Sequence, residues 1–176
     1  MQLPRVREGL QCDTRAKQVN LFPVRHSISV ESLNDSLFEM LLEAFEATDP
    51  PGWFDGLLTT LEAIDAITAS NPPASGRSSI AGHCAHLRYS LELTNAWLRN
   101  ESLEVDFSQA WALQRVDDAT WNDLKKSITH QYERMLEFTR SREGWSEETL
   151  VMDMKSALHV AYHVGAIRQI LALLKS

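Results

Sequence analysis

The chain is organised around the stretch Ala157-Leu158-His159-Val160-Ala161-Tyr162-His163-Val164-Gly165, which lies in a predicted helix over Leu150–Lys175. Two histidines four residues apart on a helix share one face, one turn above the other. Their imidazole rings can reach one metal ion, which needs a further ligand from elsewhere because protein zinc sites take three or four. Apolar residues recur around the pair at helical spacing and predict that it borders a packed interior: Met152, Leu158, Ile167, Ile170, Leu171 and Leu174.

The H-x-x-x-H spacing alone has little specificity, because two residues of one type at one spacing arise easily by chance. The alternative for His159 and His163 is a pair of partly buried side chains whose ring nitrogens are satisfied by hydrogen bonds. Val160 stands where the H-E-x-x-H motif of zinc metalloproteases has the glutamate that acts as general base. The sequence therefore disfavours a protease of that class.

Length and composition indicate one globular domain, with 176 residues of which 44% are hydrophobic and 23% charged. The net charge of −7 repels polyphosphate, and the chain has no run of Lys and Arg, so we expect no nucleic-acid partner. No apolar segment reaches the roughly 18 to 20 residues that cross a bilayer, and residues 1–8 lack the apolar core of a signal peptide. We therefore expect a cytoplasmic protein without a membrane partner.

The cysteine content fits a reducing compartment. Cys12 and Cys84 are the only two cysteines, too few for a disulfide framework. Cys84 adjoins His83 but points about 100° away from it around a helix axis, so we interpret it as a small core residue.

The sequence predicts an irregular N-terminal extension over residues 1–29. It predicts an all-α domain, a four-helix bundle, over residues 30–176. The extension contains prolines and no sustained apolar period, and its His26 is not counted among the candidate ligands. After residue 29 apolar residues recur at threes and fours, and no alternating strand-like run of useful length occurs. The first helix ends at the breaker Asp49–Gly52 and a second apolar run covers Trp53–Ile67, so this part is two pieces or one kinked rod.

The other helices have predicted capping residues. Ser78 or Ser79 begins a helix to about Asn100, Asp117 or Asp118 begins one to Arg140, and Ser146 opens the last. The sixteen residues between the second and third bundle helices are irregular, which allows a crossover, with Phe107 and Trp111 as anchors over one end of the core. The inward face of the second bundle helix is predicted to contain His83, His86 or Leu87, Ser90, Leu93, Thr94 and Trp97.

A second histidine cluster strengthens the case for a metal site. His83 and His86 lie three apart on the predicted helix that follows Ser79, so they share a face. Facing helices of a bundle can direct such side chains into one interior pocket. One ligand from this helix would complete a three-histidine site with His159 and His163, and spacing does not choose between His83 and His86.

The segment Ser79-Ile80-Ala81-Gly82-His83-Cys84-Ala85-His86-Leu87 resembles the S-[VI]-x-x-x-x-x-H-L segment of the DinB-like (DinB/YfiT) superfamily of small bacterial four-helix-bundle proteins. His159-x-x-x-His163-x-Gly165 resembles the family's H-x-x-x-H-x-G-Q segment, and the resemblance covers about residues 30–176. It implies a divalent metal held by His86, His159 and His163, with His83 as a fourth ligand or a close neighbour. Two positions depart from the pattern: Ser78 replaces a tryptophan and Ala166 a glutamine.

The resemblance also implies a class of chemistry. Three neutral histidines leave a zinc or nickel ion its full charge and an open position, which is typical of catalytic sites. Such an ion activates water or binds a thiol as thiolate, and relatives include transferases and isomerases that use low-molecular-weight thiols. We therefore expect a thiol-dependent S-transferase or a hydrolase that acts on a small molecule, and a homodimer.

Other candidates for the site are weaker. The carboxylates of Glu62, Asp65, Glu92 and Asp153 are more simply interpreted as solvated surface charges, and no general base or other catalytic residue is assigned. We expect Tyr162 to pack against a neighbouring helix and Arg168 to be a surface or interface cation. The alternative function is a non-catalytic, dimerising or stress-associated bundle protein in which a metal is structural or absent.

Overall fold

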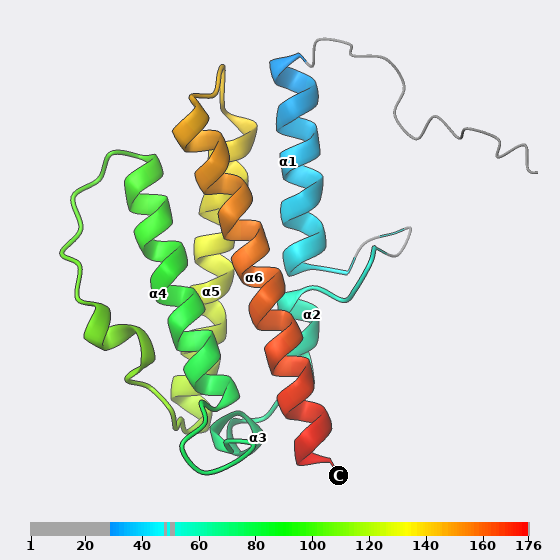
Figure 1. Cartoon of the computed structure of the whole chain (residues 1–176), viewed down its shortest axis with the longest axis vertical. Coiled ribbons are helices and arrows are strands. Elements are labelled where there is room, and N and C mark those ends of the chain that lie inside the picture. The colour runs from blue at the N-terminus through cyan, green and yellow to red at the C-terminus, as the bar shows by residue number, and fades with distance from the viewer. Residues whose placement is uncertain (1–28, 48, 50–51, 176) are drawn as a thin grey trace, which may run out of the picture.

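In the computed structural model, four long helices lie alongside one another: α1 (Val30–Phe45), α4 (Ile80–Leu98), α5 (Asp118–Arg140) and α6 (Glu147–Leu174) (Figure 1). Three short elements connect them: α2 (Leu57–Glu62), α3 (Ala66–Ser70) and the 3-10 helix η1 (Phe107–Trp111). The structure describes residues 29–47, 49 and 52–175, and in these residues it contains no strand. The predicted all-α class is confirmed, whereas the extension before residue 29, with Cys12 and His26, lies outside the described residues.

The core forms where the long helices meet. α4 packs against α5 and α6, and α1 packs against the same two helices from their other side. Phe45 of α1 stacks on Tyr132 of α5 with ring centroids 4.3 Å apart, and the indole of Trp121 donates a hydrogen bond to the Ile64 carbonyl. Cys84 is fully buried in this core, as its interpretation as a small core residue required. The contact between α4 and α6 positions the histidines.

Three predicted helix starts are confirmed at the level of single capping residues. The side chains of Ser79, Asp117 and Ser146 each accept a hydrogen bond from a backbone N–H in the first turn of α4, α5 and α6. Each satisfies a donor that a helix leaves unpaired at its N-terminus. The start of α4 at Ser79 matters for function, because it sets where His83 and His86 lie along the helix.

The apolar run from Trp53 to Ile67 forms separate pieces rather than a kinked rod. α1 ends at Phe45, α2 begins at Leu57, and the side chain of Asp65 accepts a hydrogen bond from Thr68 N and starts α3. Trp53 is 95% exposed and Ile67 is 75% exposed, so neither belongs to the buried stripe. The chain changes direction between α2 and α3, so the apolar residues of this run do not lie on one face of a single helix.

Other expected core positions also face solvent, among them Leu174, which is 37% exposed. Trp97 is 45% exposed because the buried side of α4 runs through Leu87, Leu91, Asn95 and Leu98 instead. Phe107, predicted to anchor an end of the core, is 75% exposed, and Leu158, predicted to border the interior, is 65% exposed.

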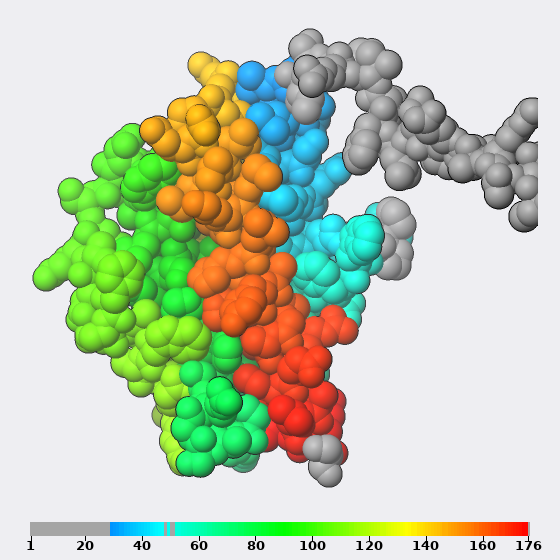
Figure 2. Space-filling view, viewed as in Figure 1, coloured from blue at the N-terminus to red at the C-terminus, as the bar shows by residue number. Residues whose placement is uncertain are grey.

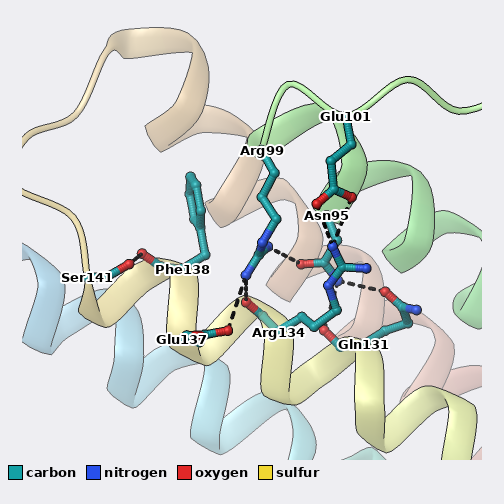
Figure 3. Close-up of polar contacts among 8 residues, drawn as sticks. All are labelled: Asn95, Arg99, Glu101, Gln131, Arg134, Glu137, Phe138 and Ser141. Carbon is teal, nitrogen blue, oxygen red and sulfur yellow. Dashed lines mark hydrogen bonds and ion pairs between the residues drawn. The ribbon is translucent and has the colours of Figure 1, made fainter.

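A polar network fixes the C-terminal end of α4 against α5 (Figure 3). The Asn95 side-chain amide is fully buried and donates to both the carbonyl and the side-chain oxygen of Gln131, at 2.8 and 2.9 Å. Arg99 donates to the Arg134 carbonyl at 2.6 Å, and both Glu101 carboxylate oxygens accept from the Arg134 guanidinium at 2.9 Å. Because buried polar groups are costly unless paired, this network favours one alignment of the two helices.

α6 corrects one expectation from the sequence. By length and composition it is the one helix of the described residues that is apolar enough to cross a membrane, although no such segment was expected. It packs against α1, α2 and α4 and buries Asp153 and His163, although only 33% of its most apolar window is buried. The same length and composition occur in core helices, so they are weak evidence for a membrane segment.

Candidate metal centre

The structure brings together the three histidines to which the resemblance assigned a metal. The His86 Nε2 atom of α4 lies 3.2 Å from the His159 Nε2 atom of α6, which in turn lies 3.0 Å from the His163 Nε2 atom. One ring nitrogen from each residue falls within 4.8 Å of the others. Three nitrogens from two helices, 73 residues apart in sequence between His86 and His159, therefore converge on one point.

The donor set fits a divalent cation better than it fits a hydrogen-bonded cluster. A neutral imidazole has one N–H and one lone pair, so His159 Nε2 can donate one proton or accept one. It faces two other ring nitrogens at hydrogen-bonding distance, but it can form a good hydrogen bond with only one of them at a time. Ligand nitrogens about 2.0–2.1 Å from a tetrahedral zinc lie about 3.3–3.4 Å apart, close to the separations found between these atoms. A cation that accepts all three lone pairs would resolve the conflict.

Burial keeps these imidazoles neutral. Desolvation lowers the pKa of His163 to about 3 and that of His86 to about 4, with the neighbouring histidines as a second cause. Desolvation also lowers the pKa of His159 and of His83. All four rings are therefore unprotonated at neutral pH and keep the lone pairs that a metal requires.

His83 lies beside the triad and contacts it through one ligand. Its Nδ1 atom is 2.8 Å from the Nδ1 atom of His163, whose Nε2 atom faces His159. Spacing left His83 and His86 as alternatives for the ligand from this helix, and the geometry favours His86. His83 is placed to accept a proton from His163 Nδ1, which fixes the ring orientation of a ligand.

Replacing His83 by alanine is expected to weaken metal binding about 10- to 100-fold without changing the number of ions bound, because an acceptor behind a ligand is lost rather than a ligand. His83→Asn is the matched variant, since its amide oxygen can still accept from His163. Competition with a chromogenic chelator measures both affinities. A loss in His83→Ala as large as that in His86→Ala would instead make His83 a ligand.

Trp111 of η1, which the sequence predicted as an anchor over one end of the core, packs against the histidine cluster. Its ring stacks on His86, with centroids 4.2 Å apart and planes at 13°, and meets the edge of His83 at 5.3 Å. Beneath it, His86 Nδ1 is buried and has no hydrogen-bond partner among the described residues. No spacing could have indicated this contact, because Trp111 lies in an irregular stretch without a period.

The carboxylates considered as bases lie elsewhere. Glu92 pairs with Arg88 at 2.6 Å, Asp65 caps α3, and Glu62 is exposed. Asp153 is fully buried, not a solvated surface charge, and accepts a hydrogen bond from Thr139 on α5 at 3.2 Å. In the described part of the chain, no carboxylate forms a hydrogen bond with any of the four histidines, so none of these carboxylates is assigned as a general base.

Two further residues near the ligands are surface groups. Tyr162 is 70% exposed, and its ring meets that of His163 on the same helix with centroids 5.1 Å apart, so the expectation that it packs against a neighbouring helix is wrong. Arg168 pairs with Asp55 at 3.6 Å across the surface, which agrees with its interpretation as a surface cation.

Comparison of the chain with models of protein families, with curated proteins and with solved structures finds no match. The geometry of the centre is therefore the basis for its proposed chemistry.

Proposed function

We propose that this chain is a metal-dependent enzyme of the DinB-like kind, a four-helix bundle in which His86, His159 and His163 hold one divalent ion, zinc or nickel. The observation that supports it most is the convergence of three neutral Nε2 atoms at 3.0 and 3.2 Å from two packed helices. The motif resemblance supports the same three residues independently of their geometry. Measurement of bound metal in wild type and His159→Ala tests the assignment directly.

When bound, the ion supplies a Lewis acid that lowers the pKa of a coordinated water or thiol toward neutrality. The residues of this chain supply the rest. The three imidazoles add no charge of their own, so they leave the ion its full positive charge. Trp111 stacks over His86 and restricts water on that side, while His83 holds the His163 ring in one orientation.

The proposed reactions are transfer of a low-molecular-weight thiol to an electrophile and hydrolysis of a small ester or amide. Metal-loaded protein is tested with glutathione plus 1-chloro-2,4-dinitrobenzene, and with 4-nitrophenyl acetate. Activity in either assay should fall by more than about 100-fold in His159→Ala, because the Lewis acid contributes several kcal/mol. His130→Ala, which alters an exposed histidine on α5, should keep it. Equal activity in His159→Ala and wild type contradicts an enzymatic role for this centre.

A second candidate, a non-catalytic bundle with a structural metal, is favoured by the lack of a carboxylate in contact with the histidines. The two are separated by thermal unfolding with and without chelator. A metal that holds the fold together contributes much of the folding free energy, so its removal lowers Tm strongly. A modest decrease, together with a retained helical spectrum, favours the enzymatic proposal.

We also propose that the protein is a homodimer that packs through α6. Figure 2 shows the outer side of this helix uncovered along one face of the molecule. Apolar side chains at helical spacing lie exposed on it: Val151, Met154, Leu158 and Tyr162. A straight apolar helix face can pair with its own copy about a two-fold axis, and an exposed patch of this kind marks an interaction site.

Introducing a charge into that face is expected to make the protein monomeric. Leu158→Glu puts a carboxylate at the centre of the proposed interface, where it would be desolvated against its own copy. Phe107→Glu is the matched control, because Phe107 is as exposed but lies on η1. Light scattering after size exclusion should give a dimer mass for wild type and the control. A wild-type monomer, or a dimeric Leu158→Glu, contradicts the proposal.

We also propose that the protein is cytoplasmic. The content of two cysteines, too few for a disulfide framework, supports a reducing compartment. The expected partners are a small-molecule substrate and the second copy.

A further inference from the structure

A cavity of about 300 Å³ lies beside the start of α4, between the loop that follows α3 and the segment that precedes α5. Two exposed arginines and three serines are among the residues that line it. Six of its lining residues have polar or charged side chains: Ser70, Arg77, Ser78, Ser79, Gln114 and Arg115. The histidine cluster does not line this cavity.

Hydrogen bonds hold the two walls of the cavity together. Ser79 Oγ donates to the Gln114 carbonyl at 2.6 Å, and Ser79 N donates to Gln114 Oε1 at 2.9 Å. Two residues after Gln114, Val116 N donates to Ser70 Oγ at 2.9 Å. Arg115 lies between Gln114 and Val116, so its backbone is fixed on both sides at the rim of the cavity.

The opposite wall owes its shape to a turn. Gly76 has a φ of 73°, a left-handed conformation that residues with a side chain rarely adopt. The next residue, Arg77, donates its N–H to the Ala74 carbonyl at 3.1 Å and closes the turn. This turn places Arg77 on the lining of the cavity that Arg115 also lines, 38 residues later in the sequence.

Both arginines are exposed, and neither has an acidic partner among the described residues. In residues 29–47, 49 and 52–175, neither Arg77 nor Arg115 forms an ion pair, whereas Arg88, Arg99, Arg134 and Arg168 all do. Asp117, two residues after Arg115, caps α5 through Thr120 N and forms no ion pair among the described residues. Arg140 and Arg142, which also form no ion pair among the described residues, instead lie over the aromatic rings of Phe38 and Phe138. Two uncompensated guanidiniums at one cavity therefore indicate a site for an anion.

We propose that this cavity binds the phosphate group of a small phosphorylated molecule. Guanidinium groups offer paired N–H donors that match phosphate oxygens, and two of them offset the charge of a phosphomonoester dianion. The Ser78 hydroxyl, which has no hydrogen bond within the described residues, adds a donor. A volume of about 300 Å³ is at the lower end for small-molecule pockets, so it suits one phosphate with a small organic group.

Side chains, rather than the N-terminus of α4, carry the site. At the start of α4, Ser79 N is paired with Gln114 Oε1 and Gly82 N with Ser79 Oγ at 3.1 Å. Removing the arginine side chains should therefore remove the affinity. The proposal is also independent of the metal, because the anion site shares no lining residue with the histidine cluster.

The test is calorimetric titration of metal-free protein with inorganic phosphate at pH 7.5, where the histidines are neutral. We expect saturable binding to one site, and at least about tenfold weaker binding by Arg77→Gln/Arg115→Gln, since two charge-assisted contacts are lost. The matched control, Arg88→Gln/Arg168→Gln, removes the same net charge from arginines that are already paired. It should bind within about twofold of wild type, because distant surface charges are screened.

A second variant and a second ligand make the result decisive. Ser78→Asp puts a carboxylate in the cavity without touching either arginine, and it should weaken phosphate binding as well. Succinate carries two carboxylates and should bind more weakly than phosphate. The proposal is overturned if wild type shows no saturable binding, if both double variants bind alike, or if succinate binds as tightly as phosphate.

Discussion

Protein purified without a nickel column is expected to contain one divalent ion per chain, and His159→Ala is expected to contain almost none. His159 is the middle member of the triad, since its Nε2 atom lies 3.2 Å from that of His86 and 3.0 Å from that of His163. Its loss leaves two nitrogens from two helices, fewer than the three or four ligands of protein zinc sites. Losing a residue that is hydrogen-bonded to a ligand typically weakens metal binding about 10- to 100-fold. Losing the ligand itself should weaken metal binding more, by over about 100-fold.

Elemental analysis by mass spectrometry measures the ion and its identity together. His130→Ala is the matched control, because it removes an exposed imidazole on α5 and should leave the metal content unchanged. His86→Ala should behave like His159→Ala, although the two residues lie on different helices. Full metal occupancy in either triad variant would falsify the assignment of that residue as a ligand.

The local parts of this structure could be predicted from the sequence because their causes are local. Ser79, Asp117 and Ser146 cap their helices through hydrogen bonds to residues three positions away. His159 and His163 share a face because of the pitch of one helix. Such features need no knowledge of how distant segments meet.

The features that could not be predicted depend on tertiary contacts. Periodicity left both His83 and His86 available, and only the packing of α4 on α6 directs His86 toward His159 and His83 toward His163 Nδ1. Leu158 has the spacing of a core residue but is 65% exposed, because α6 is apolar on several sides and its neighbours cover only some of them. A hydrophobic pattern shows that a face can be buried, not that a partner within the chain covers it.

Asp153→Asn is expected to make folding less sensitive to pH. The Asp153 side chain is fully buried on α6, one of its oxygens has no partner among the described residues, and the other accepts a single hydrogen bond from Thr139. Burial raises the pKa of this carboxyl from 3.8 to about 6, against smaller lowering effects of the Thr139 hydrogen bond and Arg142. A charged carboxylate is therefore unfavourable at this position.

The direction of the effect follows from proton binding. Between pH 4 and pH 6 the folded protein holds a proton that the unfolded chain has released, so rising pH lowers the free energy of unfolding. A pKa raised from 3.8 to about 6 corresponds to about 3 kcal/mol, present at pH 4 and lost by pH 7. Carboxylates whose pKa is lowered by helix capping, such as Asp65 and Asp117, act in the opposite direction and over a lower pH range.

Urea unfolding of metal-free wild type and Asp153→Asn at pH 4 and pH 7 isolates this group. An amide cannot ionise, so the variant should gain about 2–3 kcal/mol relative to wild type between the two pH values, whatever fixed cost the unpaired amide adds at both. Asp123→Asn is the control, because Asp123 is exposed on α5 and its replacement should change stability by less than about 0.5 kcal/mol. If the free energies of unfolding of Asp153→Asn and wild type differ by the same amount at pH 4 and pH 7, the pKa of Asp153 is the same in the folded and unfolded protein. That result would contradict the effect of burial on this carboxyl.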